Sequence, residues 1–172
     1  GFDIDIEIDD ESKLPLFIDN IRRVLDLDAD NMVIDKIIAN ILGDKFNVTK
    51  GIRIPGIWSI FEAAVRAILG QQISVKMANN YITQLVEKLG QRSDNYILFP
   101  TPQVIANSDL GFLRISQAKK DCLINFSSYI NNIAADSYDD NKFHPEEFIK
   151  LKGIGPWTVQ YIQMRGQSLS DI

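Results

Sequence analysis

Apolar residues recur three and four residues apart along most of the chain, which is the spacing of one face of an α-helix. The pattern is clearest at residues 14–27 and 31–42, and Gly43 then ends the second helix. Serines that precede several apolar segments are typical N-caps, and Ser59 with Glu62 forms a capping box. The predicted helices comprise residues 14–27, 31–42, 61–69, 75–89, 103–107, 117–135, 145–151 and 156–165.

Residues 2–8 have a different period, because apolar and acidic side chains alternate strictly there. A period of two predicts a half-buried β-strand with one face in water. A lone strand is not stable in water, so it must pair with another strand or be the remnant of a sheet. We therefore expect a mainly α fold with a β-strand remnant at the N-terminus.

The composition excludes several classes of protein. The 172 residues are 45% hydrophobic, which is enough for one sizeable core or two small ones. No apolar run approaches the roughly 20 residues of a membrane span. The acidic start lacks the basic and apolar regions of a signal peptide. These features favour a cytoplasmic protein with no membrane contact.

The chain has one cysteine, Cys122, and one histidine, His144. A single cysteine excludes an internal disulfide and the four thiolates of a typical iron–sulfur cluster. One residue of each type also disfavours a zinc site, and no nucleophile-elbow motif accompanies His144. We interpret Cys122 as a half-buried helical residue, although Lys119 and Lys120 beside it would favour a lower pKa.

The net charge of −5 is unusual for a protein that binds nucleic acid. Its distribution is uneven, since residues 1–44 carry twelve acidic and four basic side chains, whereas residues 45–172 carry eleven and fourteen. The acidity is concentrated at one end of the chain. A phosphate site elsewhere is therefore not excluded, because such a site depends on local geometry.

Two glycines flank one apolar residue between the last two predicted helices, in the segment IKLKGIGPWT. Gly153 can adopt a positive φ and end the first helix, while Ile154 can point inward between the helices. Gly155 and Pro156 leave backbone N–H groups bare at the start of the second helix, and such a terminus suits a phosphate. Lys152 would add one positive charge. The motif is equally compatible with a tight helix–helix turn that binds nothing.

Trp157 and Tyr161 are four residues apart on the last predicted helix and therefore share one of its faces. Two aromatic rings in this arrangement can line a slot for a flat base. On spacing alone, ordinary core packing is the more common explanation.

With these residues in view, the chain resembles the 3-methyladenine DNA glycosylase II family of the helix-hairpin-helix DNA glycosylase superfamily. The similarity extends over residues 14–172, which implies a multi-helix glycosylase body there, and residues 1–13 then resemble a strand remnant of the family's N-terminal β-rich domain. The matching segments are RIPG at 53–56, FE at 61–62, VRAILGQQIS at 65–74, ISQAK at 115–119, LKGIGPWT at 151–158, Tyr161 and Arg165-Gly166.

The resemblance implies a base excision repair enzyme that flips a damaged nucleotide and hydrolyses the N-glycosidic bond of alkylated purines, chiefly 3-methyladenine. Trp157 and Tyr161 occupy positions of the family's base-binding cleft, where aromatic faces attract a cationic base. Gln72 occupies the position that intercalates into the vacated stack. The residues implied to bind DNA phosphate are Lys152, Gly153, Gly155, Trp157 and Thr158.

The resemblance also bears on cofactors and catalysis. No organic cofactor is implied, and backbone carbonyls at Leu151 and Gly153 are the implied ligands of a structural monovalent cation. Bifunctional members of the superfamily have a lysine nucleophile where this chain has Trp157, so a monofunctional hydrolase is implied. The family's catalytic aspartate is expected beyond Ile172, since Asp171 comes too early. We therefore expect a chain truncated at both ends.

The expected partner is double-stranded DNA with alkylated bases, bound by a monomer in the bacterial cytoplasm, in association with the nucleoid. Two alternatives remain open. The chain could be a non-catalytic helix-hairpin-helix DNA-binding module, or an acidic helical protein-interaction domain in which the glycine turn is purely structural. Phosphate contacts predict an affinity for DNA that falls steeply with salt, and the protein-interaction domain predicts no such binding.

Overall fold

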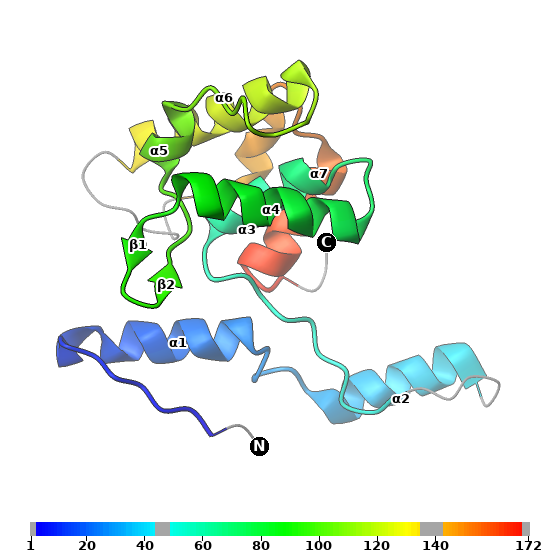
Figure 1. The fold of residues 1–172 in the computed structure, drawn as a ribbon. Helices are drawn as coiled ribbons and strands as arrows, with labels where there is room; N and C mark the ends of the chain where they lie inside the picture. Colours follow the sequence, from blue (N-terminus) through cyan, green and yellow to red (C-terminus); the bar gives the residue numbers. More distant parts are fainter. Residues whose placement is uncertain (1–2, 44–48, 135–142, 170–172) are drawn as a thin grey trace. The chain divides into compact units, whose positions relative to one another are not determined.

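The computed structural model describes residues 3–43, 49–134 and 143–169 (Figure 1). These residues are mainly helical, which confirms the predicted fold class. The chain forms two compact units, Gly1–Gly56 and Ile57–Ile172. The first contains the short 3-10 helix η1 (Glu11–Lys13) with α1 (Leu14–Val24) and α2 (Asn31–Leu42). The second contains α3 (Ile60–Gly70), α4 (Val75–Leu89), β1 (Arg92–Ser93), β2 (Tyr96–Ile97), α5 (Pro102–Ala106), α6 (Gln117–Ile133), the 3-10 helix η4 (Pro145–Lys150) and α7 (Pro156–Gly166).

The boundary between the compact units follows Gly56, whereas the sequence predicts a division after residue 13. That division followed the change in hydrophobic period from two to 3.6. A period identifies the type of an element but not the core that the element joins. The division into a strand remnant at 1–13 and a glycosylase body at 14–172 thus stays a prediction.

Residues 3–8, where the alternation predicts a strand, have no regular secondary structure. A strand is defined by hydrogen bonds to a neighbouring backbone, so alternation alone does not form one. Ile4 and Ile6 remain 44% and 38% exposed. The apolar face that the alternation predicts is therefore present but not buried.

In the first unit, the segment after α2 folds back on the end of α1. The Gly56 N–H donates to the carbonyl of Val24 at 2.9 Å. The Ile54 N–H donates to the Asp26 carboxylate at 3.0 Å, and the Arg53 guanidinium donates to the Asp26 carbonyl. No residue of α1 or α2 is buried, so the unit has no hydrophobic core within these helices. The polar contacts connect the segment after α2 to the end of α1.

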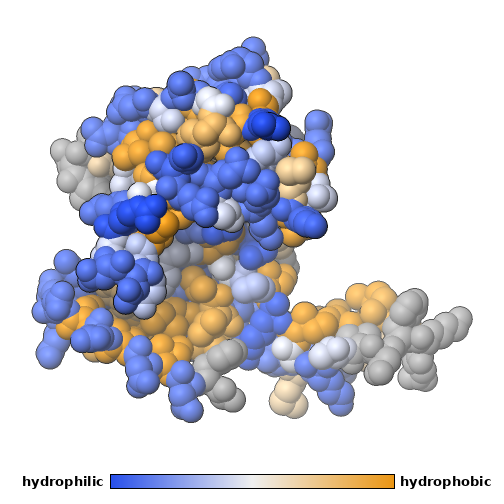
Figure 2. All heavy atoms as spheres, viewed as in Figure 1, coloured by the Kyte–Doolittle hydropathy of each residue, from blue (hydrophilic) through white to orange (hydrophobic). Residues whose placement is uncertain are grey.

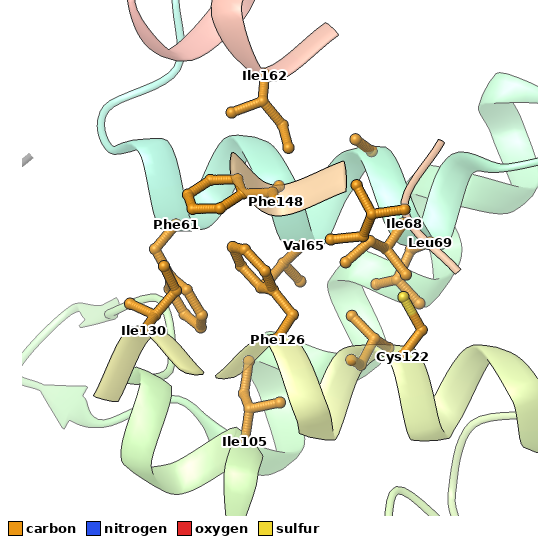
Figure 3. Packing of buried hydrophobic residues seen from close by; sticks show 14 of the residues in the cluster. Phe61, Val65, Ile68, Leu69, Ile105, Cys122, Phe126, Ile130, Phe148 and Ile162 are labelled. Carbon is orange, nitrogen blue, oxygen red and sulfur yellow. The ribbon is translucent and has the colours of Figure 1, made fainter. Parts of the chain in front are cut away.

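α3 is the central helix of the second unit, with α4, α6 and α7 packed against it (Figures 1 and 3). A helix that is apolar on nearly every side belongs in a core. In α3 only Glu62, Arg66 and Gly70 are partly exposed. Its buried residues are Ile60, Phe61, Ala63, Ala64, Val65, Ala67, Ile68 and Leu69.

Aromatic rings connect α3, α6 and η4 in this core (Figure 3). Phe61 stacks on Phe126 with ring centroids 5.9 Å apart, and Phe126 meets Phe148 edge-on at 5.2 Å. Gly166 lets α7 approach α3 closely, because a Cβ there would lie 3.3 Å from the Ala63 Cβ. The predicted final helix is thus held directly against the central one.

The predicted serine caps are confirmed. Ser59, Ser74 and Ser116 each accept a hydrogen bond from the backbone N–H three residues later. The capping box at Ser59 is only half formed, because the Glu62 carboxylate pairs with Arg66 at 2.6 Å instead of returning to the cap. An ion pair four residues apart on the same helix face competes with the reciprocal cap.

Two features differ from the sequence prediction or were not part of it. The short antiparallel pair β1–β2 was not predicted, since two residues are too few for a period to be read. The segment from Pro145 forms a 3-10 helix that ends at Lys150, close to the predicted end at Leu151. The polar loop predicted at 136–141 lies outside the described residues. None of the described helices is long and apolar enough to cross a membrane.

Candidate nucleic-acid interface

The hairpin between η4 and α7 has the backbone that the glycine spacing predicts. Gly153 has a φ of +95°, in the region that favours glycine. Ile154 is 5% exposed and belongs to the core, as predicted. Gly155 is the N-cap of α7, and no side chain caps that helix. The first N–H groups of α7 therefore lack both an intrahelical partner and a side-chain acceptor.

Gly153 is also required by a close contact with α6. A Cβ on Gly153 would lie 2.8 Å from the Sγ of Cys122 and 3.0 Å from its Cβ. Cys122 is 4% exposed, so it is buried rather than half-buried. Burial raises the pKa of the Cys122 thiol to about 11, and the Lys119 charge only partly opposes this. The thiol is thus a packing group beneath the hairpin, and not a nucleophile.

A second loop lies against this hairpin. It joins α3 to α4 through Gln71 and Gln72, and the two glutamines differ in environment. The Gln71 Nε2 donates to the Gly153 carbonyl at 2.9 Å and to the Thr158 Oγ1 at 3.0 Å. Gln72 is exposed and has a φ of +59°, which is uncommon for a residue with a Cβ. Segments 82 residues apart in sequence therefore meet at one place.

The aromatic pair on α7 is formed as its spacing predicts. The rings of Trp157 and Tyr161 have centroids 5.6 Å apart and an angle of 32° between their planes. Trp157 is 57% exposed, so it is not a core residue. The Arg165 guanidinium lies 5.8 Å from the centre of the Tyr161 ring. Trp157 thus presents aromatic surface to solvent beside the hairpin.

A pocket of about 520 Å³ lies between the hairpin and α6. Neither Trp157 nor Tyr161 lines it, so it is not the base-binding cleft that the sequence predicts. Both charged side chains in its wall, Asp121 and Lys152, are exposed. Its lining residues are Ala118, Asp121, Cys122, Ile124, Asn125, Lys152 and Gly153.

Sequence reasoning missed two residues of this region, Gln71 and Lys119. The Lys119 Nζ donates to the Gln71 carbonyl at 2.8 Å and to the Leu69 carbonyl at 3.3 Å. Burial lowers the pKa of Lys119, which the nearby Cys122 partly opposes. Both residues occur in the matching segments of the sequence, but no spacing rule connects them. The other expected site residue, a catalytic aspartate beyond Ile172, lies outside the described residues.

The first unit and much of the second match known families. Residues 1–59 match the family described as AlkA N-terminal domain. Residues 65–141 match the HhH-GPD superfamily of base excision DNA repair proteins. The hairpin itself follows the second match, so its assignment depends on its own motif and geometry.

Curated relatives agree with these matches. DNA-3-methyladenine glycosylase 2 of Escherichia coli (strain K12) is 30% identical over 158 residues, which are 87% of this chain and 55% of the relative. DNA-3-methyladenine glycosylase of Bacillus subtilis (strain 168) is 31% identical over 126 residues, 67% of this chain and 42% of the relative. The chain spans about half the length of these relatives.

A solved structure shares the fold. Clostridium acetobutylicum 8-oxoguanine glycosylase/lyase in complex with DNA aligns with a TM-score of 0.69 and 21% identity. The alignment covers 94% of this chain and 58% of that one, and at this identity it shows the fold alone. The two family matches, which together cover residues 1–59 and 65–141, and the curated relatives show that the chain belongs to the DNA-3-methyladenine glycosylase 2 family of the HhH-GPD superfamily.

Proposed function

We propose that this chain recognises DNA and the damaged base in a monofunctional glycosylase, which hydrolyses the N-glycosidic bond of alkylated purines such as 3-methyladenine. The observation that carries this proposal is the contact between the hairpin at 151–158 and the Gln71–Gln72 loop. A phosphate-binding hairpin and an exposed, strained loop residue on one surface suit a protein that holds a duplex while displacing a base. The names of the E. coli and B. subtilis relatives agree with this activity.

The hairpin is proposed to bind one DNA phosphate through its backbone. α7 begins without a side-chain cap, and a Cβ on Gly155 would meet nothing within 4 Å, so a phosphate can approach. A helix N-terminus carries about half a positive charge, and its N–H groups read no sequence. This site needs few basic side chains, which makes a net charge of −5 compatible with DNA binding. The exposed side chain of Lys152 would add a positive charge that attracts the phosphate.

Gln72 is proposed to enter the base stack when the damaged nucleotide leaves it. A residue with a Cβ at a φ of +59° stores backbone strain of about 1 kcal/mol or more, and such strain often marks a functional position. The amide of Gln72 can hydrogen-bond the base that is left without a partner, which an aliphatic side chain cannot do.

Trp157 and Tyr161 are proposed to receive the flipped base. An N-alkylated purine nucleotide carries positive charge, and exposed Trp157 offers a π-face to it. Trp157 also supports hydrolysis without a covalent intermediate, because an indole cannot form the Schiff base that a lysine would form. The catalytic aspartate remains a sequence prediction, and no described residue is assigned that role.

The test is release of 3-methyladenine from methylated duplex DNA, by this chain and by the longest natural form of the protein that its gene encodes. We expect release without strand cleavage and without borohydride trapping by the active form. Trp157→Ala should lower kcat/KM about 10- to 100-fold, the effect of losing base–aromatic stacking. Tyr96→Ala, a change to an aromatic residue 74% exposed on β2, is the matched control.

Base release, DNA binding and borohydride trapping together distinguish this proposal from the two alternatives. Salt-dependent binding to abasic DNA without base release from any form would indicate a non-catalytic DNA-binding module. Absence of DNA binding in low salt would refute both DNA-binding functions and favour a protein-interaction domain. Trapping by borohydride would contradict the monofunctional assignment.

We also propose a weak monovalent cation site at the hairpin, formed by the carbonyls of Leu151 and Gly153. The Leu151 carbonyl accepts the Ile154 N–H at 3.1 Å, and the Gly153 carbonyl accepts the Gln71 amide. Each carbonyl keeps a second lone pair for a cation, and DNA phosphate would supply the remaining ligands. DNA affinity should then be higher in potassium than in tetramethylammonium at equal ionic strength, and equal affinities would contradict the site.

A further inference from the structure

Gln71 lies between the two loops that the proposed function assigns to DNA. Its side-chain amide donates to the Gly153 carbonyl at 2.9 Å and to the Thr158 Oγ1 at 3.0 Å. Thr158 is 2% exposed, so its hydroxyl has no access to solvent as an alternative partner. Gln71 therefore fixes the distance between its own loop and the start of α7.

Lys119 holds the same loop from α6. Its ammonium group donates to the Gln71 carbonyl at 2.8 Å and to the Leu69 carbonyl at 3.3 Å. These carbonyls lie at the C-terminal end of α3, where a cation complements the helix dipole. Cys122, three residues later on α6, packs directly beneath Gly153. One face of α6 therefore supports both the Gln71–Gln72 loop and the hairpin.

We propose that Gln71 and Lys119 are positioning residues that hold Gln72 in fixed register with the phosphate-binding hairpin. This inference rests on the proposed function, because it assigns no new contact with DNA. The peptide of Gln71 is fixed at its carbonyl by Lys119, and its side chain is fixed by Gly153 and Thr158. Gln72 follows directly and keeps its positive φ because its neighbour cannot rotate.

A rigid link between the hairpin and Gln72 would direct part of the DNA-binding energy against base stacking. When the hairpin grips a phosphate, a rigid connection places Gln72 at a fixed depth in the duplex, so part of the binding energy opposes base stacking. With a loose connection, the hairpin still binds phosphate, but Gln72 moves independently of it. Losing the connection should therefore reduce preference for a flipped or abasic site more than affinity for undamaged DNA.

The experiment compares four variants of the chain with the wild type. Gln71→Met keeps the length of the side chain and removes its donor, and Lys119→Met removes the ammonium group. Lys119→Arg restores a donor, and Gln103→Met is the matched control because Gln103 is exposed on α5. Two readouts are taken: the ratio of affinities for abasic and undamaged duplex, and amide hydrogen exchange of residues 71–74 and 153–158 without DNA.

We expect Gln71→Met and Lys119→Met to lower the abasic preference about tenfold, with affinity for undamaged duplex changed less than about twofold. Exchange should rise in both segments together. Lys119→Arg should recover most of the preference, and Gln103→Met should resemble the wild type. If Gln71→Met unfolds, Lys119→Met tests the inference by the same two readouts.

The inference is overturned if exchange in the two segments is unchanged in Gln71→Met, or if affinities for both duplexes fall equally. It is also overturned if Lys119→Arg behaves like Lys119→Met. A wild type without abasic preference would instead refute the proposed function. The exchange measurement would still decide whether Gln71 and Lys119 couple the two loops.

Discussion

The two compact units use similar hydrophobic patterns to different effect. α1 and α2 have apolar residues at helical spacing, yet neither contains a buried residue, and Leu16 and Ile41 are 67% and 76% exposed. Figure 2 shows this apolar surface over the helices of the first unit. α3 shares the helical spacing but is apolar on nearly every side, and it buries eight residues. A hydrophobic period therefore identifies the face of a helix that requires a partner, but it does not supply the partner.

The largest expected difference between the units is in core substitutions. Phe126→Ala should lower the free energy of unfolding by about 3–5 kcal/mol, because Phe126 is fully buried between Phe61 and Phe148. Leu16→Ala on α1 should change it by less than about 0.5 kcal/mol. Urea denaturation of both variants measures the contrast. Equal losses would mean that α1 joins a core.

Two glycines with positive φ sharpen the comparison. Gly153→Ala combines backbone strain with a contact 2.8 Å from the Cys122 Sγ, and should cost about 2–4 kcal/mol. Gly51→Ala in the first unit has a φ of +74° but nothing within 4 Å of the new Cβ, so it should cost about 1 kcal/mol. Thermal unfolding measures both. A Gly153→Ala, Cys122→Ala double variant should recover part of the larger loss.

Helix caps test the same contrast at a smaller scale. Ser59→Ala removes the N-cap of buried α3 and should lower global stability by about 1 kcal/mol. Asp30→Ala removes the N-cap of α2, whose residues are not buried, so the change should appear mainly as faster local amide exchange in residues 31–35. A global loss from Asp30→Ala would show that α2 unfolds together with the core.

The pH dependence of the second unit depends in part on Cys122. Burial raises the folded pKa of its thiol from 9.0 to about 11, so the folded state retains a proton that the unfolded state loses. The contribution of the protonated Cys122 thiol to the free energy of unfolding is therefore fully present below pH 9 and declines as pH rises toward 11. Cys122→Ala should flatten this decline in denaturation midpoints measured from pH 8 to 11. An unchanged slope would contradict the assignment to Cys122.

The sequence predicted local features of the site well. Gly153 has the positive φ that its place between two helices requires, Ile154 is buried, and Trp157 and Tyr161 share a face. Each of these follows from residue type and spacing over a few positions. Exposure of Trp157 did not follow, because spacing alone favoured core packing. The roles of Gln71 and Lys119 were not predicted either, because their hydrogen-bond partners are distant in sequence. The Gln71 side chain binds Gly153, 82 residues away, and Lys119 binds the Gln71 carbonyl, 48 residues away.

The sequence by itself determined most of the helices, their serine caps and the hairpin backbone, because each is recorded in short-range patterns of residue type, and the resemblance of its motifs indicated the family. Only the tertiary structure decided that Glu62 pairs with Arg66 rather than with its cap, that Cys122 lies beneath Gly153, and that Gln71 joins two distant loops. These contacts depend on how helices pack, and packing brings together residues whose separation along the chain has no fixed period.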